Sequence, residues 1–391
     1  MLTVIDEQIQ FGQEAFRTIG GVRAIPAALM NSQSLGDADL LIVRSVTRVD
    51  ESLLGNSRIK FVGSVTSGVD HIDFDCLQKR NIAFANAPGC NAASVAEYVM
   101  AALCFLREKG LLASDARIGV VGVGHVGRQV ARKACGLGFA VLKNDPPAAL
   151  KGENEDFLPL DELMSCDVLT LHVPLIEDGP FRTRRFFDNA RLRQIKRGGV
   201  LINTSRGEVV DEPALISCLQ DGHLSGAVID VWTGEPRINT NLLQRAMLGT
   251  PHIAGYSLEG RTAGTIAVYR AACRFLGVPE TWQCQLPSEN QSLILAAKES
   301  VELSAGRAVL QVYDIHADDA RLRAMLSPLC GEKDKFFIEL RKRYSIRREF
   351  SSRRVRTEGL GSNLLDKLRA LGFTCENALG IQDAPAPERT G

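Results

Sequence analysis

Three residues whose chemistry suits the oxidation of an alcohol each follow a strand-like run in the second half of the chain. Arg206 follows VLINTS, Glu235 follows IDVWTG, and His252 follows the short LGTP. A histidine can accept the hydroxyl proton while a hydride leaves, a paired carboxylate favours the protonated imidazole and fixes its tautomer, and an arginine can hold a substrate carboxylate. Taken singly, a residue of each type is more often a surface ion-pair member or a satisfied polar residue. Their joint placement predicts that they are catalytic.

A glycine-rich turn provides the second chemical signal. GVGHVG follows the strand-like RIGVV and opens a helix, so its N–H groups can bind a pyrophosphate. The residues predicted to do this are Gly122, Gly124, His125, Val126 and Gly127.

An acidic residue, Asp145, ends the next strand-like run, 18 residues after Gly127. This spacing suits an acid that binds a ribose 2′-hydroxyl group and repels a 2′-phosphate, which predicts NAD as the cofactor. Lys143 is the only base nearby and leaves weak NADP tolerance open.

The elements around these residues alternate between β-branched runs and amphipathic stretches. This pattern predicts parallel α/β sheets in two series, from Met1 to about Pro88 and from Ala116 to Tyr256. We expect a capping box of Ser94 and Glu97 to begin a helix over 94–108, and helices capped at Asp161 and Asp211. The helix-like stretch 257–277 is long enough to return the chain to the first sheet.

The predicted fold is thus α/β, with a doubly wound Rossmann domain over 94–256 and a discontinuous flavodoxin-like substrate domain over 1–93 plus 257–285. A small α+β domain is expected over 286–380, followed by a flexible tail over 381–391.

Composition excludes several classes of function. Lysine plus arginine (46) balances aspartate plus glutamate (46), so no global field favours nucleic acid, and no apolar run reaches the length of a membrane span. Ten dispersed cysteines with no C-x-x-C spacing, and an amino terminus without a secretory signal, indicate a cytoplasmic protein. The histidines show no metal spacing, so no metal site is expected.

The motif order GVGHVG with Asp145, NTSRGEVVDEPAL, DVWTGEP and PHIAGYS resembles the D-isomer-specific 2-hydroxyacid dehydrogenases over about 1–277. The resemblance implies that Arg206 binds substrate, that Glu235 is the partner of His252, and that His252 is the acid/base. It also implies further cofactor contacts at Val173, Thr204, Ser205, Asp230 and Gly255, and substrate contacts at Ser45, Thr66 and Tyr256. Many relatives have a hydroxyl residue where this chain has Val173.

The segments RSVTRVDESLL, PGCNAASVAEYV, HIAGYSLEGRT and YSIRREFSS are similar to one branch of that family, which acts on 4-phospho-D-erythronate. This implies NAD-dependent oxidation to 3-hydroxy-2-oxo-4-phosphooxybutanoate in pyridoxine 5′-phosphate (vitamin B6) biosynthesis, and a homodimer formed through the third domain. The substrate phosphate needs further cations, for which Arg44, Arg347 and Arg348 are candidates; a solvated basic face is the alternative for the last two. Another 2-hydroxyacid dehydrogenase, for example one acting on phosphoglycerate, and a non-catalytic NAD-sensing scaffold related to corepressors remain alternatives.

Overall fold

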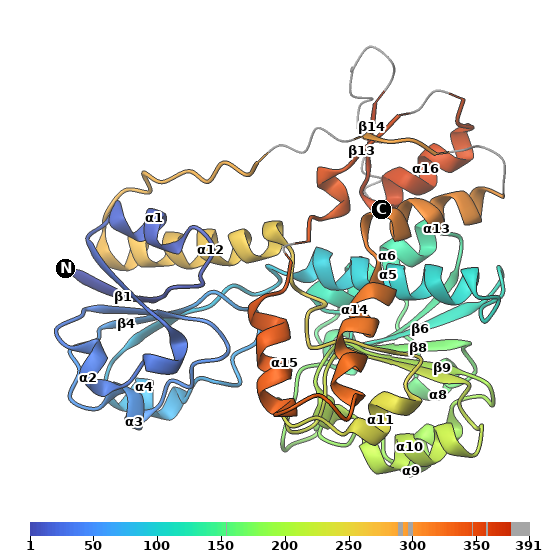
Figure 1. Cartoon of the computed structure of the whole chain (residues 1–391), viewed down its shortest axis with the longest axis horizontal. Helices are drawn as coiled ribbons and strands as arrows, with labels where there is room; N and C mark the ends of the chain where they lie inside the picture. Colours follow the sequence, from blue (N-terminus) through green and yellow to red (C-terminus); the bar gives the residue numbers. More distant parts are fainter. Residues whose placement is uncertain (154, 288–291, 296–299, 346, 357–358, 377–391) are drawn as a thin grey trace. The chain divides into compact units, whose positions relative to one another are not determined.

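The computed structural model describes residues 1–153, 155–287, 292–295, 300–345, 347–356 and 359–376 (Figure 1). The chain divides into two compact units, one of Met1–Ala92 and Tyr256–Ser288, the other of Ala93–Gly255 and Glu289–Gly391. The chain therefore passes between the units three times, at 92/93, at 255/256 and at 288/289. The expected tail over 381–391 lies outside the described residues.

The first unit contains a five-stranded parallel sheet of order β2-β1-β3-β4-β5, the order of flavodoxin-like doubly wound folds. Its strands are β1 (Leu2–Asp6), β2 (Gly21–Ile25), β3 (Leu40–Val43), β4 (Phe61–Ser64) and β5 (Ala83–Ala85). Its helices are α1 (Gly12–Arg17), α2 (Ser32–Leu35), α3 (Glu51–Leu54), α4 (Phe74–Lys79) and α12 (Leu258–Leu276), with a 3-10 helix at Ala27–Leu29.

Both faces of this sheet are covered, because successive strand residues point to opposite sides. Val4 and Leu41 join one core, whereas Ile5 and Ile42 join a second core together with Tyr269 of α12. Figure 1 shows α1 and α12 on one side of the sheet and α2, α3 and α4 on the other. Helix α12 thus returns the chain to the first unit after residues 93–255 have formed the first part of the second.

The second unit contains a six-stranded parallel sheet of order β11-β10-β9-β8-β6-β7. Its strands are β6 (Arg117–Val121), β7 (Ala140–Asn144), β8 (Val168–Leu171), β9 (Val200–Asn203), β10 (Gly226–Ile229) and β11 (Leu248–Gly249). The helices of this part are α5 (Ala92–Glu108), α6 (His125–Gly136), α7 (Pro146–Leu150), α8 (Leu160–Leu163), α9 (Asn189–Gln194), α10 (Glu212–Gln220) and α11 (Thr240–Arg245), with a 3-10 helix at Gly207–Val209. The strand order reverses direction at β6, and doubly wound folds bind ligands at the carboxyl ends of the strands flanking such a point.

The C-terminal segment adds a small parallel sheet of order β12-β13-β14 with helices beside it. Its elements are β12 (Ser292–Leu293), α13 (Val301–Val312), α14 (Ile315–Arg323), α15 (Lys333–Lys342), β13 (Arg354–Arg356), α16 (Ser362–Leu371) and β14 (Thr374–Glu376), with 3-10 helices at Ala324–Leu326 and Phe350–Ser352.

This segment shares a core with the six-stranded sheet. Leu322, Met325 and Phe337 join the same buried cluster as Trp232 and Leu243. Polar contacts reinforce the packing, because Oδ1 of Asp319 accepts a 2.7 Å hydrogen bond from the N–H of Gly249 in the edge strand β11. Helix α14 therefore covers an edge that would otherwise be open to pairing.

The α/β class with two doubly wound parallel sheets and a small C-terminal domain is confirmed. The cap at Asp211 is also confirmed, because its carboxylate accepts a hydrogen bond from Ala214 N. The cap at Asp161 is wrong: α8 begins at Leu160, with Pro159 at the N-cap position and no side-chain capping bond. Among helices in the described parts of the chain, none combines the length and the apolar composition that crossing a bilayer requires.

The capping box of Ser94 and Glu97 is also wrong, because α5 already begins at Ala92. Both side chains instead contact the C-terminal segment. Ser94 Oγ donates to Glu349 Oε1 at 2.8 Å, and Glu97 Oε1 accepts a 3.0 Å bond from Phe350 N. Serine and glutamate often cap helices, but in this protein Ser94 and Glu97 bind a segment that is distant in the sequence.

Candidate active site

The predicted cofactor and catalytic residues of the second unit follow adjacent strands of the six-stranded sheet. The glycine turn follows β6, Val173 follows β8, Arg206 follows β9, Asp230 follows β10 and His252 follows β11. Because parallel strands all end at the same edge, these residues form a row along the carboxyl edge of the sheet.

Each glycine of the turn has a distinct steric requirement. Gly122 has φ of +85°, in the left-handed region that favours glycine. A Cβ on Gly127 would lie 2.0 Å from the Gly122 carbonyl oxygen, whereas one on Gly124 would meet no heavy atom of the described residues within 4 Å. The turn is therefore tight at its ends and open in the middle, at the N-terminus of α6. These features fit a bound pyrophosphate.

Asp145 lies at the end of β7 and is held by backbone N–H groups. Its Oδ2 accepts a 2.7 Å bond from Val123 N in the glycine turn, and its Oδ1 caps α7 through Ala148 N at 2.9 Å. This fixed, half-buried carboxylate beside the turn fits the ribose of NAD.

The residues at the ends of β8 and β9 form a small polar network. His172 bonds Thr170 through Nε2 at 2.9 Å and Thr204 through Nδ1 at 3.3 Å, and burial lowers its pKa to about 3, so it is neutral. Ser205 Oγ donates to Asn203 Oδ1 at 2.8 Å. The expected cofactor residues Thr204 and Ser205 are thus engaged within the protein. Val173 lies beside the glycine turn, because a Cβ added to Gly122 would be 2.8 Å from Val173 Cγ1.

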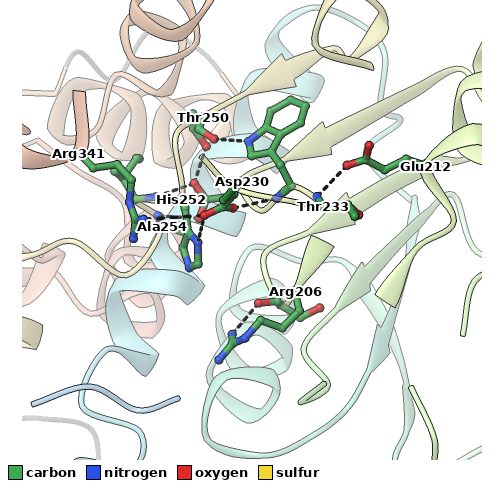
Figure 2. A network of polar contacts seen from close by, with 12 residues as sticks. Arg206, Glu212, Asp230, Thr233, Thr250, His252, Ala254 and Arg341 are labelled. Carbon is green, nitrogen blue, oxygen red and sulfur yellow. Dashed lines mark hydrogen bonds and ion pairs between the residues drawn. The ribbon is translucent and has the colours of Figure 1, made fainter. Parts of the chain in front are cut away.

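Glu235 and His252 form a hydrogen-bonded pair, which we call the catalytic pair; His252 is labelled in Figure 2. Oε2 of Glu235 lies 2.8 Å from His252 Nδ1, and its Oε1 accepts a 2.9 Å bond from Trp232 N. Burial raises the pKa of Glu235, but His252, Arg341 and the Trp232 N–H lower it more, so its pKa lies below the usual value. An ionised Glu235 therefore holds Nδ1, and Nε2 is the nitrogen available for proton transfer.

Asp230 anchors the loop that carries His252. Its Oδ1 accepts bonds from Thr250 Oγ1 at 2.6 Å and Ile253 N at 2.8 Å, and its Oδ2 accepts a 2.9 Å bond from Ala254 N. The main chain of His252 has φ of +56°, a conformation rare outside glycine. The buried carboxylate thus stabilises a strained backbone at the site. The family resemblance implies that Asp230 contacts the cofactor. The structure shows that its carboxyl group anchors the loop that carries His252.

Arg206 follows β9, next to the strand that Asp230 follows. Its Nη1 donates to the Ser205 carbonyl oxygen at 2.7 Å, and its own carbonyl accepts from Asn203 Nδ2 at 2.9 Å. Figure 2 shows Arg206 in the same close view as the catalytic pair, on a neighbouring loop.

The expected substrate residues Ser45 and Thr66 belong to the first unit. They follow the adjacent strands β3 and β4 and so share that sheet's carboxyl edge. Thr66 Oγ1 lies 2.7 Å from Ser64 Oγ, which in turn bonds His71 at 2.9 Å.

Arg44 and Tyr256, which were also expected to bind substrate, have partners within the first unit. Arg44 donates to the buried Asp6 at 2.8 Å. Tyr256 begins the second part of the first unit and carries Arg261 over its ring at 4.3 Å, and Gly255 is the last residue before it.

Arg347 was expected to project toward the substrate phosphate, but it lies in the interior of the second unit, 7% exposed. Its Nη2 donates to the carbonyl oxygens of Ser94 at 3.0 Å and Ala254 at 2.6 Å, and its guanidinium stacks 4.1 Å above the Tyr313 ring. A run of basic residues shows charge but not which members are buried, which is why the sequence suggested a surface role. Both carbonyls adjoin points where the chain passes between the units.

Arg341 of α15 was not singled out from the sequence. Its Nη1 lies 3.8 Å from Oε2 of Glu235, the oxygen that also binds His252 (Figure 2). It lies in the same basic run as Arg347, but no sequence signal separates it from its neighbours, because the contact joins residues more than a hundred positions apart.

Residues 104–254 match the family profile described as the D-isomer specific 2-hydroxyacid dehydrogenase, NAD binding domain, and residues 286–372 match a domain of unknown function (DUF3410). An erythronate-4-phosphate dehydrogenase of Marinobacter nauticus is 43% identical over 380 residues, 95% of this chain and 99% of that protein. A protein of the same name from Escherichia coli is 43% identical over 356 residues, 90% of this chain and 93% of that one.

Among solved structures, a D-lactate dehydrogenase from Aquifex aeolicus complexed with NAD and lactic acid is 26% identical, with a TM-score of 0.59 over 71% of this chain and 96% of that one. The glycine turn, the catalytic pair and these similarities agree. The chain belongs to the erythronate-4-phosphate dehydrogenase family, within the NAD-dependent D-isomer-specific 2-hydroxyacid dehydrogenases.

Proposed function

We propose that this protein oxidises the 2-hydroxyl group of 4-phospho-D-erythronate with NAD, giving 3-hydroxy-2-oxo-4-phosphooxybutanoate and NADH, a step of pyridoxine 5′-phosphate biosynthesis. The assignment of this substrate rests on the extent of the similarity to the erythronate-4-phosphate dehydrogenase of Marinobacter nauticus. It covers 95% of the chain and so includes residues after α12, whereas the Aquifex aeolicus D-lactate dehydrogenase covers 71%.

The catalytic pair performs the proton transfer. His252 Nε2 accepts the proton of the 2-hydroxyl group as the C2–O bond becomes a carbonyl, and Glu235 stabilises the resulting imidazolium through its 2.8 Å bond to Nδ1. When bound, NAD accepts the hydride that leaves C2. The loop anchored by Asp230 keeps Nε2 in place during this transfer, and Arg206 binds the substrate carboxylate.

NADH formation with a panel of hydroxy acids tests this proposal. We expect purified protein to turn over 4-phosphoerythronate with a kcat/KM at least about tenfold above that for phosphoglycerate, glycerate or lactate. His252→Gln should lower kcat by about 10²–10⁴-fold while NAD still binds by calorimetry. Preference for another acid would contradict the substrate, and NAD binding without turnover of any acid would indicate a sensing scaffold.

The homodimer is a further part of the proposal. It is supported by apolar side chains exposed on the C-terminal segment: Leu329 is 95% exposed and Ile294 74%. Such residues are common at subunit interfaces. Light scattering of the full chain should give twice the chain mass of 42.5 kDa, and a monomer at every concentration tested would contradict it.

We also propose a cytoplasmic location. All ten cysteines lie in described residues and none forms a disulfide, which suits a reducing compartment. Fractionation of cells producing the untagged protein should recover it with cytoplasmic markers, and recovery with another compartment would contradict the proposal.

A further inference from the structure

The catalytic pair has a third charged neighbour that comes from outside the dehydrogenase fold. Arg341 is at the C-terminal end of α15, and its side chain is 19% exposed. The carboxylate it faces is itself 18% exposed and fixed by bonds to Trp232 N and His252. The guanidinium of Arg341 thus lies near Oε2 of Glu235, the oxygen that is already bonded to His252.

We infer that Arg341 is a positioning residue that keeps His252 in its proton-accepting form, by sharing the charge of Glu235 and repelling the imidazolium. The inference rests on the proposed function, because only an oxidation needs His252 to begin without its proton.

The physical basis is a competition for one negative charge. Alone, Glu235 at 2.8 Å would favour the protonated imidazole. A cation at 3.8 Å from the same Oε2 offsets that attraction and adds repulsion when the imidazole is charged. Because this site is partly removed from water, both effects are screened less than at the surface.

The other charged groups around the catalytic pair do not supply this effect. Asp230 is an acid, and burial raises the pKa of its carboxyl group, which is bonded to Thr250, Ile253 and Ala254. Arg206 lies on the loop after β9 with Nη1 on the Ser205 carbonyl, and Arg347 is bonded to main-chain carbonyls. Arg341, by contrast, lies within ion-pair range of the carboxylate that binds His252.

The test compares pH profiles of kcat/KM for wild type, Arg341→Met and Arg341→Lys. Arg341→Met keeps the length of the side chain and removes its charge, so we expect the acidic limb of the oxidation profile to move to higher pH by about one unit. The rate below that limb should fall about tenfold, while the plateau at high pH stays within about twofold. Arg341→Lys should restore most of the shift. Arg343→Met is the matched control, since Arg343 is the C-cap residue of the same helix, is 82% exposed and pairs with Glu339.

A second readout does not depend on turnover. In protein with labelled histidine, the imidazole resonance that disappears in His252→Gln belongs to His252, and it should titrate about one pH unit higher in Arg341→Met than in wild type. Superimposable profiles and titrations would overturn the inference, as would an equal loss of rate at every pH. If no hydroxy acid is turned over, the proposed function fails, and the titration alone decides the role of Arg341.

Discussion

Asp230→Asn tests whether this aspartate anchors the loop that carries His252 or binds the cofactor. The substitution replaces one oxygen with an NH₂ group, which then faces a backbone N–H of the loop, at either Ile253 or Ala254. A buried donor left without an acceptor costs about 1–3 kcal/mol. The left-handed backbone of His252 costs a similar amount to maintain, of order 1–3 kcal/mol.

A loss of about 2 kcal/mol corresponds to about a 30-fold fall in the population of the loop conformation that presents His252. We therefore expect kcat to fall by about 10–100-fold, KM for NAD to change by less than about threefold, and the melting temperature to drop. Asp221→Asn is the control, because that carboxylate is 46% exposed and paired with Arg193.

Steady-state kinetics and thermal unfolding of both variants separate the two roles. A normal kcat together with a KM for NAD raised more than about tenfold would refute the loop-anchor reasoning and assign Asp230 to the cofactor. Unchanged kcat, KM and melting temperature would refute both roles.

Three further predictions concern the cofactor turn and the contact with the C-terminal segment. Asp145→Ala should reduce the NAD over NADP preference in kcat/KM at least about tenfold and, by removing the cap of α7, cost about 1 kcal/mol in unfolding experiments; unchanged selectivity would count against a ribose contact. Gly124→Ala should melt like wild type but bind NAD more weakly by calorimetry, whereas Gly127→Ala should lower the melting temperature because its Cβ would overlap a carbonyl; the opposite order would disprove the steric assignment. Burial raises the pKa of Glu97 to about 8, despite the opposing charges of nearby basic residues. Its folded form therefore binds a proton more tightly than its unfolded form, and this carboxyl lowers stability as pH rises from about 5 to 8. Glu97→Gln should show a smaller loss of melting temperature over that range, and parallel curves for the two proteins would contradict the shift.

The sequence predicted the features that depend on local order. The glycine turn and Asp145 are recognisable by their spacing around one strand and one helix, and Arg206, Glu235 and His252 by their positions after strands. Parallel topology then brings strand ends to one edge, so no knowledge of distant contacts was needed.

Apart from the start of α8, the features it missed depend on contacts between distant segments. Ser94 and Glu97 have the spacing of a capping box, yet their partners are more than 250 positions away. The burial of Arg347 and the placement of Arg341 likewise follow from packing of the C-terminal segment, which residue type and charge do not reveal.

The position of Arg347 has a consequence for the order of folding during synthesis. Its two carbonyl partners precede it by 253 and 93 positions. At about 5–20 residues per second, translation from Ala254 to Arg347 takes roughly 5–20 s. During that time the loop that carries His252 has already been synthesised, but the hydrogen bond from Arg347 to Ala254 cannot yet form. The nascent NAD-binding sheet can form, but the site becomes complete only after the last part of the chain has been made.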